Sequence, residues 1–177
     1  MPDLDNLKKA FDQIEKKRSV SFLKDIARSI SENNIDRMAT DEIMKGYSIT
    51  NYSAYKTEFL DIVLDYIEIV LEDDIITQED LSNSEQLKRI FKIKEGDFYR
   101  YKYDEVRILI LRQLYKLYAD NTINKEEALE KVSLQELFDL SYDQFGGFDL
   151  EEAERALMRG ADIMDLDIFI KNYYKRK

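Results

Sequence analysis

A run of carboxylates is the part of this 177-residue chain best suited to chemistry. Four acids recur at intervals of four, three and four residues, so a helix would carry them along one face, and two more follow at its end. Like charges so close repel one another unless neighbouring Lys or Arg side chains, a cation or a basic partner relieve them. A solvated face is the simpler account, and partner binding is the functional one. This acidic stripe consists of Asp61, Asp65, Glu68, Glu72, Asp73 and Asp74.

Two acidic turns offer the oxygen ligands that Ca²⁺ and Mg²⁺ prefer. The first turn contains Asp73 and Glu79, and the second contains Asp120 and Glu126. These four carboxylates are candidate metal ligands, although an acid in the first turn of a helix is favourable by itself, by about 0.3–1 kcal/mol. An EF-hand is excluded because, with the aliphatic residue of either turn at loop position eight, the first and third ligand positions hold Ile, Leu, Lys or Tyr.

Two residue types are missing, and their absence limits the chemistry. The chain has no His and no Cys, which removes the usual general base near neutral pH, the thiolate nucleophile, zinc-thiolate sites and His-containing di-metal sites. No Gly-rich phosphate loop is present either. We therefore expect a protein that is not an enzyme and has no cofactor other than, at most, a divalent cation such as Ca²⁺ or Mg²⁺.

The charge of the chain is acidic and uneven. The net charge is −10, and residues 1–50 contain nine acids and nine bases, so the whole excess lies in 51–177. Such a surface disfavours DNA, RNA and anionic membranes and suits a basic protein partner or divalent cations, although acidity also serves solubility. The polar N-terminus and the absence of an apolar run of roughly 20 residues favour a cytoplasmic location.

Tyrosines form a second group of candidate binding residues. Tyr47 and Tyr52 lie in the uncharged segment 46–54, where exposed tyrosines would be good interface anchors and partial burial is the alternative. In 99–103, tyrosines alternate with Arg100 and Lys102, as in a base-stacking surface. Two bases in so acidic a chain make nucleic-acid binding a poor explanation, and we expect that segment to pack.

An internal duplication arranges these residues. Residues 60–98 and 107–145 align without a gap at an offset of 47, and between the identities many apolar positions match apolar positions, as Val63 matches Ile110 and Ile67 matches Leu114. Each copy contains an apolar helix, an acidic turn, a second apolar helix and a third short segment. The identical pairs are Asp73 and Asp120, Ile76 and Ile123, Glu79 and Glu126, Leu87 and Leu134, Phe91 and Phe138, and Phe98 and Phe145.

The composition and this pattern predict an all-α, single-domain bundle of about eight helices that contains a duplicated helical-hairpin unit. Only 5 Gly and 1 Pro are present, too few for the turns of a β-sandwich or barrel. We expect a helical arm over 1–50 packed on the same domain, the duplicated core over 51–145, and C-terminal helices over 146–177. Segment 46–54 is predicted to be a loop, and Thr40 is predicted to cap the helix before it.

The two acidic turns identify a possible relationship. The second turn has Ala119-Asp120, the aliphatic Ile123, the capping Asn124 and then Glu126; the first has Asp73, Ile76, Thr77 and Glu79, and Leu140-Ser141 follows later. Over residues 55–145 this pattern resembles the TerB-like family of tellurite-resistance proteins, which is also found in the N-terminal region of the co-chaperone DjlA and has a duplicated helical unit. The family glycine is replaced by Asp74 and Asn121, which tolerate left-handed backbone. The resemblance implies stress-response or defence associations but no reaction.

Three functions are compatible with these observations. The first is a non-enzymatic binding or adaptor module that contacts a protein partner through its acidic surface. The second is an inhibitor, such as an immunity protein that neutralises a basic toxin or nuclease by charge complementarity. The third is a divalent-cation-responsive module that uses the carboxylates of the acidic turns.

Overall fold

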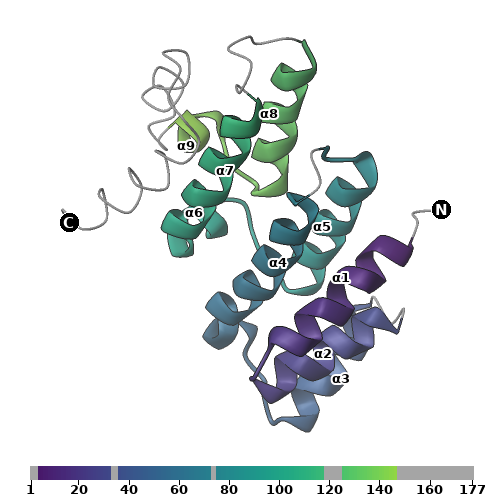
Figure 1. Cartoon of the computed structure of the whole chain (residues 1–177). Coiled ribbons are helices and arrows are strands. Elements are labelled where there is room, and N and C mark those ends of the chain that lie inside the picture. The colour runs from purple at the N-terminus through teal and green to yellow at the C-terminus, as the bar shows by residue number, and fades with distance from the viewer. Residues whose placement is uncertain (1–3, 33–35, 73–74, 118–124, 147–177) are drawn as a thin grey trace. The chain divides into compact units, whose positions relative to one another are not determined.

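All regular structure in the described part of the chain is helical (Figure 1). The computed structural model describes residues 4–32, 36–72, 75–117 and 125–146, and none of these ranges contains a strand. The predicted all-α class is therefore confirmed. The C-terminal helices predicted within 146–177 lie outside the described residues. No described helix is long and apolar enough to cross a membrane. Contacts divide the chain into two compact units, Met1–Asp97 and Phe98–Lys177.

The first unit contains six helical elements. In chain order they are α1 (Leu4–Lys17), α2 (Ser21–Ser31), α3 (Arg37–Gly46), the 3₁₀ helix η1 (Tyr52–Tyr55), α4 (Lys56–Val70) and α5 (Gln78–Ile90). Helix α1 packs against both α2 and α4 (Figure 1). Its predicted apolar face is buried, with Leu7, Phe11 and Ile14 inaccessible to solvent. Burial of this face holds the N-terminal arm against the first repeat.

Two details of the arm differ from the prediction. Asp36, not Thr40, caps α3, because its side chain accepts a hydrogen bond from the backbone N–H of Ala39 at 2.7 Å. Thr40 lies inside the helix and donates its hydroxyl to the carbonyl oxygen of Asp36. The segment predicted as a loop over 46–54 contains η1, which Asn51 caps through Ser53 N–H. In both places the residue directly before the helix has a short polar side chain, and this side chain accepts a hydrogen bond from a backbone N–H of the first turn.

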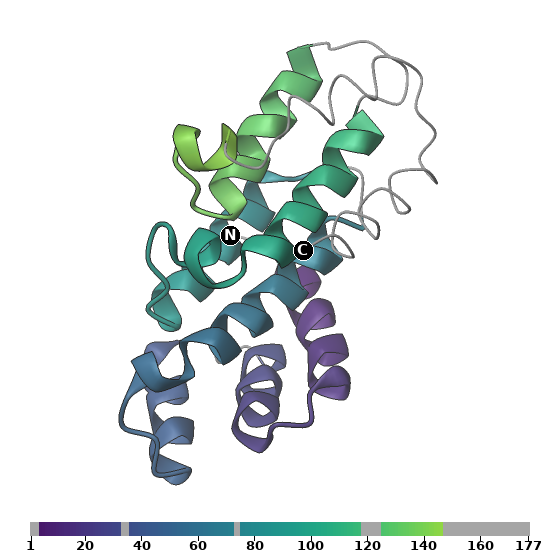
Figure 2. The same ribbon diagram turned by 90° about the vertical axis from the view of Figure 1, so that its left-hand side faces the viewer.

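The second unit contains the other described helices. They are α6 (Asp97–Tyr101), which begins at the unit boundary, α7 (Tyr103–Leu117), α8 (Lys125–Leu137) and α9 (Tyr142–Gly146). Helices α7 and α8 form a hairpin, seen in teal and green in Figure 2. Phe98 from α6 and Phe138, which follows α8, meet edge to face with ring centroids 5.9 Å apart. The short helix α6 is thus held against the base of this hairpin.

The predicted duplication is present in the backbone. Helices α4 and α7 have the same length and begin 47 residues apart, and so do α5 and α8. After each second helix one residue takes a left-handed conformation, Lys92 with φ 54° and Asp139 with φ 48°. The N–H groups of Lys92 and Ile93 then bond to carbonyls three and five residues back, and those of Asp139 and Leu140 repeat this. This is a Schellman motif in both copies.

The residue after each Schellman motif donates its backbone N–H to the side chain three residues further on. In the first copy the N–H of Lys94 donates to the carboxylate of Asp97 at 2.8 Å. In the second copy the N–H of Ser141 donates to Gln144 Oε1 at 3.0 Å, and Gln144 N–H donates back to Ser141 Oγ. Ser141 and Gln144, which are three residues apart, thus form a capping box, and the bond from the backbone N–H recurs 47 residues earlier.

Side chains at matched positions are buried in both copies. Their relative exposure is 8% or less, which confirms the predicted core of the repeat. The pairs are Val63 and Ile110, Ile67 and Leu114, Leu87 and Leu134, Ile90 and Leu137, Phe91 and Phe138, Ile93 and Leu140, and Phe98 and Phe145.

The left-handed residue gives a direct test of the turn. We expect Lys92→Val to destabilise the protein relative to Lys92→Gly by about 1–2 kcal/mol, because a β-branched residue strongly disfavours positive φ. Both variants remove the ammonium group, so the difference isolates the backbone. Urea unfolding followed by circular dichroism measures it. At Lys94, which does not have positive φ, the same pair should show no advantage for Gly. Equal stability of the two Lys92 variants would contradict the assignment.

Candidate functional site

Helix α4 carries most of the acidic stripe. Asp61, Asp65 and Glu68 are half-buried along the helix, and Glu72 is exposed just beyond its C-cap, Leu71. The structure therefore places three of these carboxylates on one helix, as their spacing predicts, and Glu72 directly after it. Asp73 and Asp74 lie outside the described residues. The C-terminal end of α4 also has no basic residue in its last turn, which leaves the negative end of the helix dipole uncompensated there.

One member of the stripe is neutralised inside the protein. Arg18, which follows α1, donates from Nη2 to Asp65 Oδ2 at 2.5 Å. The two side chains are only 19% and 22% exposed, so this ion pair is better shielded than a surface pair. It joins the arm to α4 and places Asp65 in a structural role. Sequence reasoning missed it because the two residues are 47 positions apart and no local pattern connects them.

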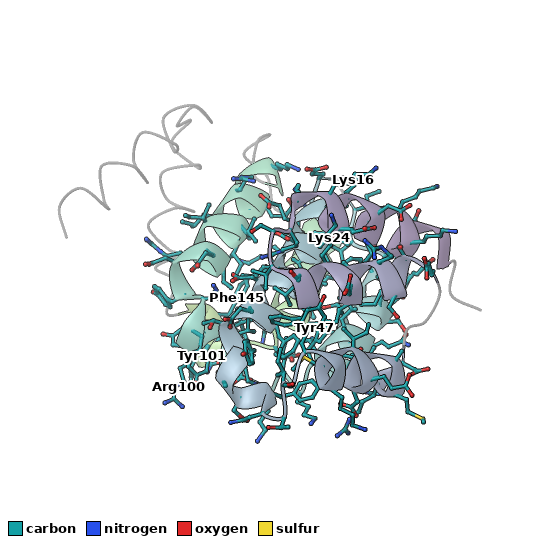
Figure 3. All side chains as sticks on the ribbon, turned by 90° about the horizontal axis from the view of Figure 1, so that it is seen from below. Lys16, Lys24, Tyr47, Arg100, Tyr101 and Phe145 are labelled. Carbon is teal, nitrogen blue, oxygen red and sulfur yellow. The ribbon has the colours of Figure 1, made fainter. Side chains whose placement is uncertain are left out.

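The loop after α3 is anchored by its two candidate tyrosines. The Tyr47 hydroxyl donates to Asp25 Oδ2 at 2.6 Å, and its ring lies 6.3 Å from that of Phe22. Tyr47, labelled in Figure 3, thereby lies between α2 and α3 while 42% of it stays exposed. Its hydroxyl is already used within the chain, and its exposed ring surface is what remains for a partner.

Tyr52 is held more tightly than Tyr47. Its hydroxyl donates to Asp41 Oδ1 at 2.5 Å, and its ring stacks on Phe59 with centroids 5.2 Å apart. The ammonium group of Lys92 lies 3.9 Å from the ring centroid, which is a cation–π contact. Partial burial raises the pKa of Tyr52, and the hydrogen bond to Asp41 raises the pKa further, because ionisation would place a phenolate beside a carboxylate.

Stacked rings connect this loop to the first repeat. Phe59 contacts Phe22 from α2, Tyr52 from η1 and Phe91 after α5, with centroid separations between 5.0 and 6.2 Å. Phe22 also meets Tyr55 edge to face at 5.1 Å. The aromatic residues of segment 46–55 are therefore part of the packing that joins the arm to the hairpin.

A charged contact closes the hairpin at its other end. Lys56, the first residue of α4, donates from Nζ to Asp97 Oδ2 at 2.7 Å and to the carbonyl oxygen of Lys92 at 2.6 Å. Both charged side chains are less than one-fifth exposed. The contact joins the start of α4 to the left-handed turn. The second copy has Tyr103 and Gln144 at the matched positions. The Lys56–Asp97 ion pair is therefore specific to the first copy.

The first acidic turn leads into a complete helix cap. Thr77 Oγ1 accepts from the backbone N–H of Asp80 at 3.2 Å, and Asp80 Oδ2 accepts from the N–H of Thr77 at 2.9 Å. Thr77 and Asp80 have the three-residue spacing of a capping box, and both of its bonds are present. Glu79 lies in the first turn of α5, where the helix dipole favours its charge.

The remaining candidate metal ligands lie mostly outside the described residues. Asp73 and Asp120 are not described, and neither is the side chain of Glu126. Among the side chains that are described, no three Asp or Glu residues converge closely enough to hold a metal ion. The cation site remains a prediction from the sequence.

Known proteins add nothing to this geometry. No family model, no curated protein and no solved structure matches the chain. Any functional assignment therefore depends on the residues themselves.

The Arg18–Asp65 pair yields a stability prediction. We expect Asp65→Asn to lower the free energy of unfolding by about 1–3 kcal/mol, because it leaves a shielded guanidinium without its countercharge. Arg18 Nε is already buried without a hydrogen-bond partner among the described residues, so the remaining bond matters more. Denaturant unfolding measures the change. Glu72→Gln, at an exposed position, should alter stability by less than about 0.5 kcal/mol. Equal losses of stability for the two substitutions would contradict a structural role for Asp65.

Tyr52 yields a prediction about pH. Its pKa is raised in the folded protein, whereas an unfolded tyrosine titrates near 10. The contribution of Tyr52 is therefore fully present below about pH 10 and is lost as the pH rises from there towards the folded pKa. We expect urea unfolding between pH 8 and 11 to show a smaller loss of stability for Tyr52→Phe than for the wild type. Tyr142→Phe, at an 85% exposed position, should follow the wild type. Parallel curves for all three proteins would contradict the prediction.

Proposed function

We propose that this chain is a non-enzymatic binding module whose α4–α5 hairpin contacts a basic protein partner. The observation that carries this proposal is the difference in charge between the two copies of the repeat. From Lys56 to Asp80 the first copy has nine acids and one base, whereas the matched residues 103–127 have five acids and four bases. The acidity is concentrated in one copy of a duplicated structure.

The internal duplication acts as a control for the demands of the fold. Both copies form the same helices and the same left-handed turn, so the second copy reaches this structure with nearly balanced charge. Clustered carboxylates repel one another and tend to destabilise a helix. Apart from Asp65 and Asp80, which have structural partners, the shared fold does not account for the acids of the first copy, and recognition of a positively charged partner would.

The carboxylates of the hairpin are not equally available. Asp65 is committed to Arg18, and Asp80 is committed to the cap of α5. Glu72 is exposed at the end of α4. The candidate contact region is therefore the end of the acidic stripe, at Glu72, Asp73 and Asp74, with the exposed ring of Tyr47 as a separate anchor.

The resemblance of residues 55–145 to the TerB-like family supports an adaptor in stress response or defence. An inhibitor of the immunity type would use the same acidic surface, and it differs in that the captured partner would lose an activity on binding. A cation-responsive module would instead require the acidic turns to bind Ca²⁺ or Mg²⁺, which calorimetry at millimolar metal tests directly.

The proposal is tested by affinity capture from the native cell. We expect the tagged chain to retain a basic protein at low salt and to release it at about 0.5 M NaCl, where screening extends over only a few ångströms. The variant Glu72→Gln/Asp73→Asn/Asp74→Asn should lose the partner. If the partner is a toxin or nuclease, its activity should be measured with and without the chain, which separates inhibitor from adaptor.

A matched control removes the same charge elsewhere. Glu32→Gln/Glu42→Gln/Glu95→Gln neutralises three exposed acids outside the hairpin and should retain the partner. Equal loss with both triple variants would show that bulk charge, and not the hairpin, is responsible. Capture that persists at high salt in both would contradict charge recognition altogether.

A further inference from the structure

Helix α8 has apolar side chains on its outer face as well as on its inner face. Leu129 and Val132 are 59% and 58% exposed, and because they are three residues apart they share one face of the helix. On the inner face, Leu134 and Leu137 are inaccessible to solvent. A helix that is apolar on both faces is normally covered on both. The outer face of α8 therefore has the composition of a contact surface.

The matched helix of the first copy is polar at the same positions. Ser82 and Glu85 of α5 correspond to Leu129 and Val132 of α8, and both are exposed. Glu85 Oε1 also accepts a hydrogen bond from Arg89 Nε at 2.9 Å, along the surface of α5. A single exposed aliphatic residue is common on proteins. A pair on one helix face, absent from the matched helix, is not explained by packing of the hairpin and indicates a binding surface.

One charged residue extends this surface at each end. Lys125 is the first residue of α8, and Glu136 is exposed near its end. The positions of Lys125, Leu129, Val132 and Glu136 follow one another at intervals of four, three and four, so they share one face, which we call the α8 outer face. These intervals are the same when read from either end, whereas the charges at the two ends are opposite.

This arrangement selects the orientation of a second α8 helix. In an antiparallel pair of outer faces, the position of Lys125 lies opposite that of Glu136, and the position of Leu129 lies opposite that of Val132. In a parallel pair in register, each charged position would lie opposite its own equivalent, and like charges would repel. The outer face is therefore complementary to itself in the antiparallel orientation.

We propose that the α8 outer face binds the same face of a second molecule of this chain, with the two helices antiparallel about a two-fold axis. Such an interface is isologous, because each contact occurs twice, and it closes as a dimer. One helix pair buries less surface than a standard interface of about 1,600 Å², so we expect a dissociation constant in the micromolar range. The proposal does not depend on the proposed function, since α8 belongs to the second copy of the repeat.

Sedimentation velocity of the full chain, from micromolar to millimolar concentrations, tests the dimer. The variant Leu129→Ser/Val132→Glu gives α8 the residue types of α5, and we expect it to raise the dissociation constant at least about tenfold through lost apolar burial. Met38→Ser/Ile75→Glu removes two apolar side chains that are 74% and 70% exposed elsewhere, and it should leave the constant unchanged.

A monomeric wild type would overturn the proposal. If the wild type is monomeric and Leu129→Ser/Val132→Glu also lowers the free energy of unfolding, the face is covered by another segment of the same molecule.

A charge exchange tests the antiparallel orientation. Glu136→Lys alone places a positive charge at both ends of the face and should weaken the dimer in low salt. Lys125→Glu/Glu136→Lys exchanges the two ends in both molecules and should restore the wild-type dissociation constant. A double variant as weak as Glu136→Lys would contradict the orientation.

Disulfide formation gives an independent readout, because the chain has no Cys of its own. Air oxidation of a mixture of Leu129→Cys and Val132→Cys should give mainly the mixed dimer, since these two positions face each other only in the antiparallel pair and a disulfide requires close Cα atoms. The two products are separated by mass spectrometry. Preferential joining of Leu129→Cys to itself would indicate parallel helices and would contradict the proposed pair.

Discussion

Burial of one phenylalanine at the end of the second helix of each repeat is the constraint on which the described structure depends. Phe91 and Phe138 are both inaccessible to solvent, and burying a side chain of this size contributes about 1.5–3 kcal/mol. To keep the ring inside, the chain must turn back at once. The next residue adopts positive φ, the one after it is buried, and the following N–H is capped. The short third helix of each copy follows from this sequence of events.

The two copies share this backbone and differ in the polar contacts around it. The first copy closes its hairpin with the Lys56–Asp97 ion pair, places Lys92 over the ring of Tyr52 and carries nine acids in its first half. At the positions matched to Lys56, Lys92 and Asp97, the second copy has Tyr103, Asp139 and Gln144. Residues that the two copies share are those that packing of the hairpin needs. Polar residues that differ between the copies are candidates for function, because function depends on residues added to a scaffold.

The candidate site was predictable to the extent that it depends on local spacing. The intervals between Asp61, Asp65 and Glu68 are helical, and these three carboxylates lie on α4 as expected. The capping boxes at Thr77 and Ser141 were also predictable, because each involves residues three positions apart. The partners of Asp65, Tyr47 and Tyr52 were not, since Arg18, Asp25 and Asp41 reach them only through packing of the arm. The left-handed residues were missed because Lys92 and Asp139 are not glycines.

By itself, the sequence determined the helical class, the duplication and the apolar faces. Periodicity and composition express these directly, because each depends on residues within a few positions of one another. Only the tertiary structure decided which charges are neutralised, which hydroxyls are bonded and which polar atoms are enclosed. Those outcomes depend on the distance between side chains that are far apart in the chain. Electrostatic and hydrogen-bond energies change steeply over a few ångströms of that distance, and they also depend on how far water is excluded from the contact.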